Sequence, residues 1–337
     1  MGNGLYANVL EALDDSADPL LIVCHVSPDG DAIGAALAVA YYCDGIGRAC
    51  TLVNDDPIPS RYDFLPGADR FVLTDSLSDP FSAVVAVDCA DVRRMGKSRG
   101  LVAADASLIN IDHHGTNDGF GSLNLVQPEA AATCLVLYRL FRAGDAAIGK
   151  SIALALYTGI VFDTGGFRYN NTTPEIHLAA ADLLSRDIEP FLVADRVLEA
   201  MTREQAELVR LGLATLTVHD SGRIAYVAVD QAMLAASGAT EGDVEVLLPY
   251  TRSLSGIEVG LLFRERNDGS IKVSLRSREF VDVSSIAVHF GGGGHVRAAG
   301  CEHDGPLAAA ISDLVSRVEQ AVNEAFAAHG QRHSHLK

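Results

Sequence analysis

PLLIVCHVSPDGDAIGAALAVAYYC, residues 19–43, joins a short apolar run to a longer helical segment through a polar loop. The run at 19–24 is apolar throughout instead of alternating, which is typical of a strand buried on both faces. The segment at 32–43 that follows the loop is equally apolar. A strand, a loop and a helix in this order form the repeating unit of a parallel sheet with covering helices, so the stretch predicts an α/β fold.

Three more short apolar runs follow in the N-terminal half, at 49–53, 83–87 and 107–111. Polar residues come directly after three of the four runs: His25 after the first, Asp88 after the third and Asp112-His113-His114 after the fourth. The carboxyl ends of parallel strands meet at one edge of the sheet, where open α/β sheets bind their ligands. We therefore expect a parallel sheet with helices on both faces and a polar site at this edge.

The length of 337 residues favours two domains that share a cleft. The pattern becomes mostly helical from about residue 172, and we place the domain boundary near residue 190. The predicted division is a catalytic domain at 1–190, a helical connector at 191–210, a smaller α/β domain at 211–330 and a frayed tail at 331–337. In the second domain, Asp-Ser-Gly and Asn-Asp-Gly turns predict hairpins at 216–229 and 257–277, and a terminal helix is predicted from about 306 to 327.

The composition limits where the protein acts and what it binds. A net charge of −18 argues against binding long duplex nucleic acid, whereas a small phosphate ligand needs only a local basic pocket, which residues 252–278 would supply. The longest apolar stretches are shorter than the roughly 20 residues that span a bilayer, and no secretory signal is visible, so we expect a cytoplasmic protein without membrane contact. The six cysteines form no C-x-x-C pair, and we expect them to be reduced and mostly buried.

The polar loop after the first strand carries His25, Asp29 and Asp31, which can reach around one or two divalent cations from a single turn. The alternative is that both aspartates only cap the following helix, since Asp is favoured at helix N-termini. Adding Asp88 and Asp112 at the same edge would bring several carboxylates together, and close like charges repel one another. Divalent metal is the natural compensation.

Asp163 is the only acid in the apolar segment LYTGIVFDTGGFRY, residues 156–169. A carboxylate among apolar neighbours is rarely left without a partner. It either ligates the same metal ions or forms an ion pair with Arg168. Oxygen and imidazole ligands without thiolates suit Mn²⁺ and Mg²⁺, which favours ligation.

A run of four glycines at 291–294, followed by His295 and Arg297, marks the second domain. Glycine lets backbone N–H groups approach a phosphate without interference from Cβ atoms. The alternative is that the run forms only a tight turn. The run does not match the G-x-x-x-x-G-K-[ST] pattern, so it does not indicate hydrolysis of nucleoside triphosphates by a loop of that type.

Five segments occur in the order of known motifs: HVSPDGDAIG, VDCAD, DHHGTND, TGIVFDTGGF and GGGGHVRAAG. The first four resemble the N-terminal motifs of the DHH phosphoesterase superfamily, and the fifth resembles the signature of its DHH-associated C-terminal domain. The chain is most similar to the branch that contains nanoRNases, phosphoadenosine phosphate phosphatases and cyclic di-AMP phosphodiesterases.

The resemblance implies two divalent cations, with Mn²⁺ as the first choice and Mg²⁺ or Co²⁺ as alternatives. The implied ligands of one cation are His25, Asp29 and Asp88, and those of the other are Asp31, Asp88, His113 and Asp163. His114 would face the substrate as a catalytic residue, and Asp112 would orient a neighbouring imidazole. The implied substrate-binding residues are Arg276, Gly293, Gly294, His295 and Arg297, with Arg61 and Tyr62 as further contacts.

The implied activity is hydrolysis of cyclic di-AMP, pApA and very short oligoribonucleotides to mononucleotides, together with release of AMP from 3′-phosphoadenosine 5′-phosphate. The alternatives are a single-strand exonuclease, an inorganic pyrophosphatase and a non-catalytic nucleotide sensor. The resemblance also implies a homodimer and closure of the two domains over the substrate.

Overall fold

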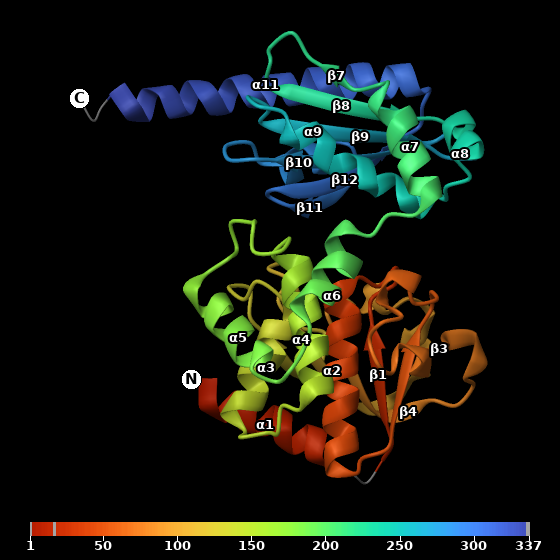
Figure 1. Cartoon of the computed structure of the whole chain (residues 1–337), viewed down its shortest axis with the longest axis vertical. Helices are drawn as coiled ribbons and strands as arrows, with labels where there is room; N and C mark the ends of the chain where they lie inside the picture. Colours follow the sequence, from red (N-terminus) through yellow and green to blue (C-terminus); the bar gives the residue numbers. More distant parts are fainter. Residues whose placement is uncertain (1, 16–17, 335–337) are drawn as a thin grey trace. The chain divides into compact units, whose positions relative to one another are not determined.

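The computed structural model describes residues 2–15 and 18–334, without the side chains of residues 2–3 and 328–334 (Figure 1). The chain divides into two compact units, Met1–Ala200 and Met201–Lys337. Each unit has its own sheet and its own buried core. The division falls inside the predicted connector at 191–210.

Unit 1 is built on a six-stranded parallel sheet with the order β3-β2-β1-β4-β5-β6. Its strands are β1 (Leu20–Cys24), β2 (Cys50–Asn54), β3 (Val72–Leu73), β4 (Phe81–Val87), β5 (Val102–Asp112) and β6 (Leu123–Val126). The predicted parallel sheet is confirmed, and the four apolar runs form β1, β2, β4 and β5. The strand order reverses between β1 and β4, which is where doubly wound sheets bind their ligands.

One face of this sheet is covered by α1 (Gly2–Asp14), α2 (Gly30–Ile46), α3 (Thr133–Ala143) and α4 (Lys150–Asp163), whose apolar residues share a core with Ile22 and Val85. On the other face, Met95 and Leu101 of the 3₁₀ segment η4 (Val92–Leu101) pack on Leu21 and Val84. In the described part of unit 1, the second face is covered by the 3₁₀ helix η4 and by loops, so helical residues pack on both faces of the sheet, as predicted.

The remaining helices of unit 1 are α5 (Pro174–Leu184) and α6 (Pro190–Ala194). Its short helical turns are η1 (Ser60–Tyr62), η2 (Ala68–Arg70), η3 (Thr74–Ser76) and the π-helical η5 (Asp195–Glu199).

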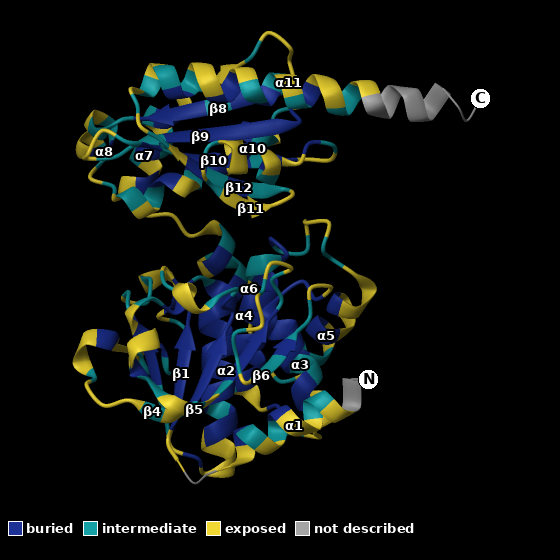
Figure 2. Cartoon of the chain, turned by 180° about the vertical axis from the view of Figure 1, so that it is seen from behind, coloured by how far each residue is buried: buried dark blue, intermediate teal, exposed yellow. Residues whose placement is uncertain are grey.

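Unit 2 has a mixed six-stranded sheet with the order β11-β12-β10-β9-β8-β7. Its strands are β7 (Thr217–Val218), β8 (Ile224–Val229), β9 (Val259–Glu265), β10 (Ile271–Ser277), β11 (Gly293–His295) and β12 (Ala298–His303). β8 and β9 are parallel, and the other neighbours are antiparallel. The pairs β7–β8 and β9–β10 are the two predicted hairpins, and Figure 2 shows the central strands as buried.

Two layers of helix cover this second sheet. One face packs on α10 (Val283–His289) and α11 (Leu307–Ser334), and the other on α7 (Arg203–Leu213), α8 (Gln231–Ser237), η6 (Glu241–Leu247) and α9 (Leu248–Ser253). The end predicted near residue 327 for the terminal helix is wrong, because α11 continues past Gly330 to Ser334. Of the predicted tail at 331–337, residues 331–334 are thus helical, and residues 335–337 lie outside the described residues. None of the described helices combines the length and apolarity needed to cross a bilayer.

Candidate metal centre

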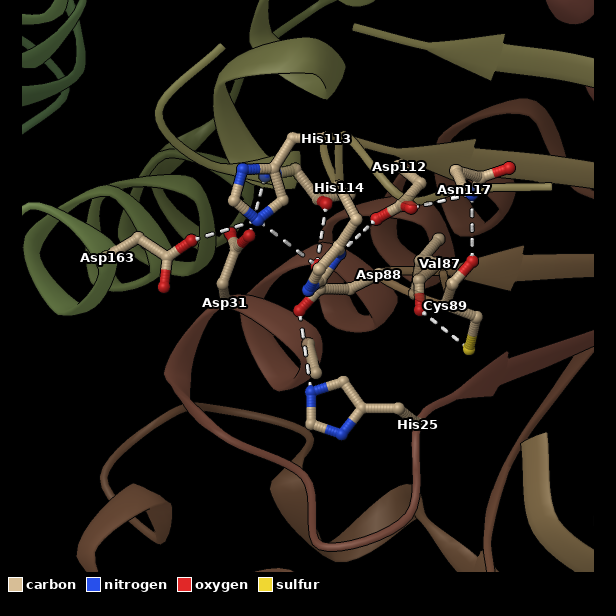
Figure 3. Close-up of polar contacts among 12 residues, drawn as sticks. His25, Asp31, Val87, Asp88, Cys89, Asp112, His113, His114, Asn117 and Asp163 are labelled. Carbon is tan, nitrogen blue, oxygen red and sulfur yellow. Dashed lines mark hydrogen bonds and ion pairs between the residues drawn. The ribbon is translucent and has the colours of Figure 1, made fainter. Parts of the chain in front are cut away.

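The carboxyl ends of β1, β4 and β5 deliver the polar residues of unit 1 to one place (Figure 3). His25 follows the last residue of β1, Asp88 follows that of β4, and β5 ends at Asp112. Three groups that could hold a metal ion form there: His25–Asp29–Asp88, Asp31–His113–Asp163 and Asp88–His113–His114. All the residues predicted to ligate metal are therefore brought together, and ligation itself stays a prediction.

Asp29 is both a helix cap and a member of the cluster. Its Oδ1 accepts the backbone N–H groups of Asp31 at 3.0 Å and Ala32 at 3.1 Å, which caps α2. Its Oδ2 lies 3.6 Å from Nε2 of His25. The two sequence alternatives for Asp29 are thus compatible, because each uses a different oxygen.

Asp31 is fully buried, and backbone groups hold its carboxylate in place. Thr133 and Cys134 donate their N–H groups to its two oxygens at 2.6 and 2.9 Å. These donors open α3, whose N-cap residue Ala132 has no capping side chain of its own. The first turn of a helix stabilises an anion, so α3 favours a charged Asp31 at this point.

Asp88 is at the centre of the cluster. Its Oδ2 lies 3.5 Å from Nε2 of His25, and its Oδ1 lies 3.6 Å from Nε2 of His113 and accepts the Thr133 hydroxyl at 2.9 Å. Its φ of +57° is in the left-handed region, which costs a non-glycine residue about 1–3 kcal/mol. Strain of this size is tolerated where the surrounding structure needs the side chain in one position.

Asp163, the last residue of α4, faces the cluster from the opposite side. Its Oδ2 lies 3.2 Å from Nε2 of His113. Arg168, the alternative partner, instead donates from Nε to the carbonyl of Gly165. Among the described residues, Asp163 is thus paired with His113 and not with Arg168.

The histidine tautomers show that the cluster suits cations. The Nδ1 atoms of His25 and His113 lie 2.8 and 3.2 Å from the carbonyl oxygens of Val26 and Ala130. A carbonyl can only accept, so each Nδ1 carries a proton, and Nε2 of each ring faces carboxylate oxygens, where it either holds a second proton or offers its lone pair to a metal ion. Acceptors that face acceptors need a proton or a metal ion between them, and a backbone carbonyl that orients a ligating histidine is a usual feature of metal sites.

The pKa values of the metal-free chain show where protons fill this role. Burial raises the pKa of Asp31 to about 7, and the charge of Asp88 adds to this. Burial and then Asp31 raise the pKa of Asp163 well above its usual range. Burial alone would lower the pKa of His25, but Asp29 and Asp88 raise it to about 10. Burial alone would raise the pKa of Asp88, but His25, and then His113 and His114, lower it below its usual value. The cluster therefore holds exchangeable protons where cations would bind.

His114 makes a different contact from the other two histidines. Its Nδ1 lies 2.8 Å from Oδ1 of the fully buried Asp112, whose Oδ2 accepts the Asn117 amide at 2.6 Å. Asn117 also donates to the carbonyl of Cys89 and to the side chain of Asn110, so the orientation of Asp112 is fixed. Burial lowers and Asp112 raises the pKa of His114, and the net shift is upward. Asp112 thus lies where it can orient the His114 imidazole, and its role stays a prediction.

Sequence reasoning did not single out Thr133, Asn117 or Gly159. A Cβ atom on Gly159 would lie 2.5 Å from Oδ1 of Asp31, so only glycine leaves room for this carboxylate. Asn117 and Gly159 lie within the quoted segments DHHGTND and TGIVFDTGGF, which was the available signal. Thr133 lies outside every quoted segment, and only the fold reveals its contact with Asp88.

The predicted substrate-binding residues belong to unit 2. Gly293, Gly294 and His295 are exposed and form β11, which pairs with β12. Gly294 has φ +142°, and a Cβ there would lie 2.6 Å from the carbonyl of Ala298, so close backbone approach requires glycine. The glycine run thus leads into the β11–β12 hairpin, which agrees in part with the alternative prediction of a tight turn.

Two of the predicted substrate contacts, Arg297 and Arg276, donate to backbone carbonyls. Nη1 of Arg297 donates to the carbonyl of Val281 at 2.8 Å, and Nη2 donates to that of Glu279. Arg276, on β10, donates to the carbonyl of Leu275 at 3.0 Å. In unit 1, Tyr62 is buried in the core and is not an exposed contact, while Arg61 is exposed.

Comparison with known proteins identifies the family. Residues 19–160 match the family model "DHH family, N-terminal domain", and residues 222–324 match the "DHHA1 domain". The bifunctional oligoribonuclease and PAP phosphatase NrnA of Thermus thermophilus is 35% identical over 95% of this chain and 93% of its own length. The cyclic-di-AMP phosphodiesterase PdeA of Listeria monocytogenes is 25% identical over 93% of this chain, which spans 49% of that longer protein.

Among solved structures, an exopolyphosphatase-related protein from Bacteroides fragilis is 26% identical, with a TM-score of 0.86 and 96% of both chains covered. Its coverage includes both units. Together with the two domain matches and the Thermus relative, it shows that this chain belongs to the DHH family and carries a DHHA1 domain after its N-terminal DHH domain.

Proposed function

We propose that the chain is a metal-dependent phosphodiesterase that hydrolyses very short oligoribonucleotides, pApA and cyclic di-AMP to mononucleotides, and 3′-phosphoadenosine 5′-phosphate to AMP. The observation that carries the proposal is the position of Asp88, which belongs to two of the three candidate metal groups. One carboxylate shared in this way suits a pair of cations about 3.5–4 Å apart. The names of the similar proteins from Thermus and Listeria support the substrate class.

The residues fit two cations. His25, Asp29 and Asp88 would hold one cation. Asp31, His113 and Asp163 would hold the other, together with Asp88, whose Oδ1 lies 3.6 Å from Nε2 of His113. Their nitrogen and oxygen donors favour Mn²⁺, with Mg²⁺ or Co²⁺ as substitutes. When bound, the cations would activate a water molecule at neutral pH and neutralise charge on the phosphoryl oxygens.

The remaining steps would depend on side chains of this chain. Asp112 keeps the Nδ1 proton of His114 in place, so proton transfer would use Nε2 of the same ring. A raised pKa keeps His114 protonated closer to neutral pH, which suits donation of a proton to the leaving oxygen. The buried Asn117 contact keeps Asp112 from turning away.

In unit 2, we propose that the backbone of Gly293 and Gly294 and the side chain of His295 bind a phosphate or a base of the substrate. Their exposure supports this assignment. Arg276 would add a charge-assisted hydrogen bond. For Arg297, whose guanidinium holds two backbone carbonyls, we propose that it mainly shapes the adjacent loop. A homodimer stays a proposal that light scattering tests.

The test is a product assay with purified full-length protein. After chelation and reloading with Mn²⁺, the protein is incubated separately with pApA, cyclic di-AMP, a 5-mer RNA, phosphoadenosine phosphate and pyrophosphate. AMP from the dinucleotides and from phosphoadenosine phosphate is expected. Phosphate released from pyrophosphate alone would instead favour a pyrophosphatase. A long single strand is tested in parallel, and its processive loss would favour an exonuclease. Absence of any product would favour a nucleotide sensor.

A further inference from the structure

Two cysteines and an arginine gather at the far end of α2 from the metal centre. Cys43 lies in the last turns of α2, thirteen residues after Gly30 and thus about 20 Å along the helix axis. Cys50 is the first residue of β2, the strand that follows α2. Cys43 is buried and Cys50 is partly exposed, so a small solvent-borne reagent reaches Cys50 first.

The two thiols lie next to each other. Sγ of Cys50 lies 3.9 Å from the carbonyl oxygen of Ala40. Helix carbonyls point toward the following turn, and Cys43 lies three residues after Ala40. The Cys50 sulfur near the Ala40 carbonyl therefore lies beside the Cys43 side chain. The Cys43 and Cys50 thiols are in fact within hydrogen-bonding reach of each other.

Arg70, at the end of η2, places a positive charge on this pair. Its Nη2 donates to Sγ of Cys50 at 3.5 Å. The same guanidinium is held by both oxygens of Asp44, at 2.7 and 3.1 Å, so its position does not depend on the cysteines. The hydrogen bond from Cys43, opposed by burial and assisted by Arg70, lowers the pKa of Cys50 to about 7. A large fraction of Cys50 is then thiolate at neutral pH, which is the nucleophilic form.

We propose that Cys43 and Cys50 form a redox-active thiol pair that hydrogen peroxide converts into a disulfide. The Cys50 thiolate attacks one peroxide oxygen, the O–O bond breaks, and Cys50 becomes a sulfenic acid while hydroxide leaves. Cys43 then attacks that sulfur, its proton joins the departing hydroxide as water, and the S–S bond forms. Two thiols lose two electrons in total, and one peroxide is reduced to two waters.

The other cysteines provide the contrast that makes the proposal specific. Burial raises the pKa of Cys24 to about 12 and that of Cys301 to about 11. Burial also raises the pKa values of Cys89 and Cys134 well above the usual range. A thiol in such a setting reacts slowly with peroxide, so Cys50 is expected to react first.

Peptide mapping of the full-length protein tests the pair. The protein is treated with one to five equivalents of hydrogen peroxide, blocked with iodoacetamide, denatured and cut with trypsin. Arg48 lies between the two cysteines, so the disulfide links the fragments 1–48 and 49–61, which are otherwise separate. The link is expected to disappear on reduction and to persist in Cys24→Ser, the variant that removes the other cysteine of fragment 1–48.

Three further variants sharpen the result. Cys43→Ser should stop at a Cys50 sulfenic acid that dimedone traps. Arg70→Gln should slow alkylation of Cys50 at pH 7, about fivefold if the pKa rises from about 7 to about 8, while Arg99→Gln leaves the rate unchanged. Unlinked fragments in the wild type, or a link that Cys24→Ser abolishes, would overturn the proposal. Each readout is chemical and independent of hydrolase activity.

Discussion

Gly159 lies on the side of α4 that faces α2, and the substitution Gly159→Ala would push a methyl group against the Asp31 carboxylate. A Cβ at this position lies 2.5 Å from Asp31 Oδ1 and 2.3 Å from Cys134 Sγ. To reach an ordinary contact of 3.4 Å, the carboxylate must retreat by about 0.9 Å. Metal sites tolerate deviations of only about 0.2 Å in ligand distance, so Asp31 would leave its position for ligation.

The cost in stability is expected to be smaller than the cost in metal binding. Overpacking of a buried site costs about 1–3 kcal/mol, and the better helix propensity of alanine returns about 1 kcal/mol. The free energy of unfolding should therefore fall by about 0–2 kcal/mol. A displaced ligand should weaken Mn²⁺ binding at least about tenfold.

Isothermal titration with Mn²⁺ and urea unfolding measure the two effects separately. Gly45→Ala is the matched control, because Gly45 is also helical and a Cβ there meets nothing within 4 Å. This control should raise stability by about 0.5–1 kcal/mol and leave Mn²⁺ binding unchanged. Adding Cys134→Ala to Gly159→Ala relieves the sulfur clash, and should restore stability but not metal affinity. Wild-type Mn²⁺ affinity in Gly159→Ala would refute the placement of Asp31 as a ligand.

Three other expectations follow from the site. The raised pKa values of His25 (about 10) and Asp31 (about 7) make the metal-free fold lose stability as pH rises, because His25 loses its favourable charge contacts and buried Asp31 takes on an unfavourable charge. The increase in Tm on adding Mn²⁺ should therefore grow from about pH 6 to about pH 8, and an increase that shrinks over this range would contradict the shifts. Asp112→Asn should lower kcat about 10²–10⁴-fold and leave the Mn²⁺ content unchanged. Because the pKa of His114 falls in this variant, its activity should be lost at a lower pH than that of the wild type. Coinciding pH–rate profiles would exclude a role of Asp112 in orienting His114. His295→Ala should raise KM for pApA about tenfold or more, the effect of losing about 1.5 kcal/mol, and an unchanged KM would remove His295 from the site.

The central part of the fold could be predicted because burial on both faces leaves a clear signal. β1 is an apolar run of five residues and β4 ends in one, while β2 and β5 overlap the mostly apolar runs at 49–53 and 107–111. β3 has two residues and β6 has four, so neither carries a pattern that differs from a loop. The end of α11 was missed because Gly330 and the polar residues after it are typical of a helix end, whereas α11 continues through them to Ser334.

The cluster could be predicted because polar residues at strand ends must meet at one edge of a parallel sheet. What the sequence leaves out are contacts across long separations. Thr133 donates to Asp88, 45 residues away, and its N–H holds Asp31, 102 residues away. Arg297 illustrates the reverse, since its charge indicates a phosphate ligand while its position commits it to backbone carbonyls. Tyr62 was also predicted to contact substrate, but its side chain is buried in the core of unit 1.

Asp88 offers the most direct test, because it is the carboxylate that the two proposed cation sites share. Asp88→Asn keeps the shape of the side chain and removes its charge, and Asp91→Asn is a neighbouring control whose carboxylate pairs with Arg93. Metal content and pApA hydrolysis are measured on the same Mn²⁺-loaded samples after gel filtration. The account predicts about two Mn²⁺ ions per chain and AMP release for the wild type and Asp91→Asn, and loss of both metal and turnover for Asp88→Asn. Full turnover, or undiminished Mn²⁺ content, in Asp88→Asn would contradict a centre built on this shared carboxylate.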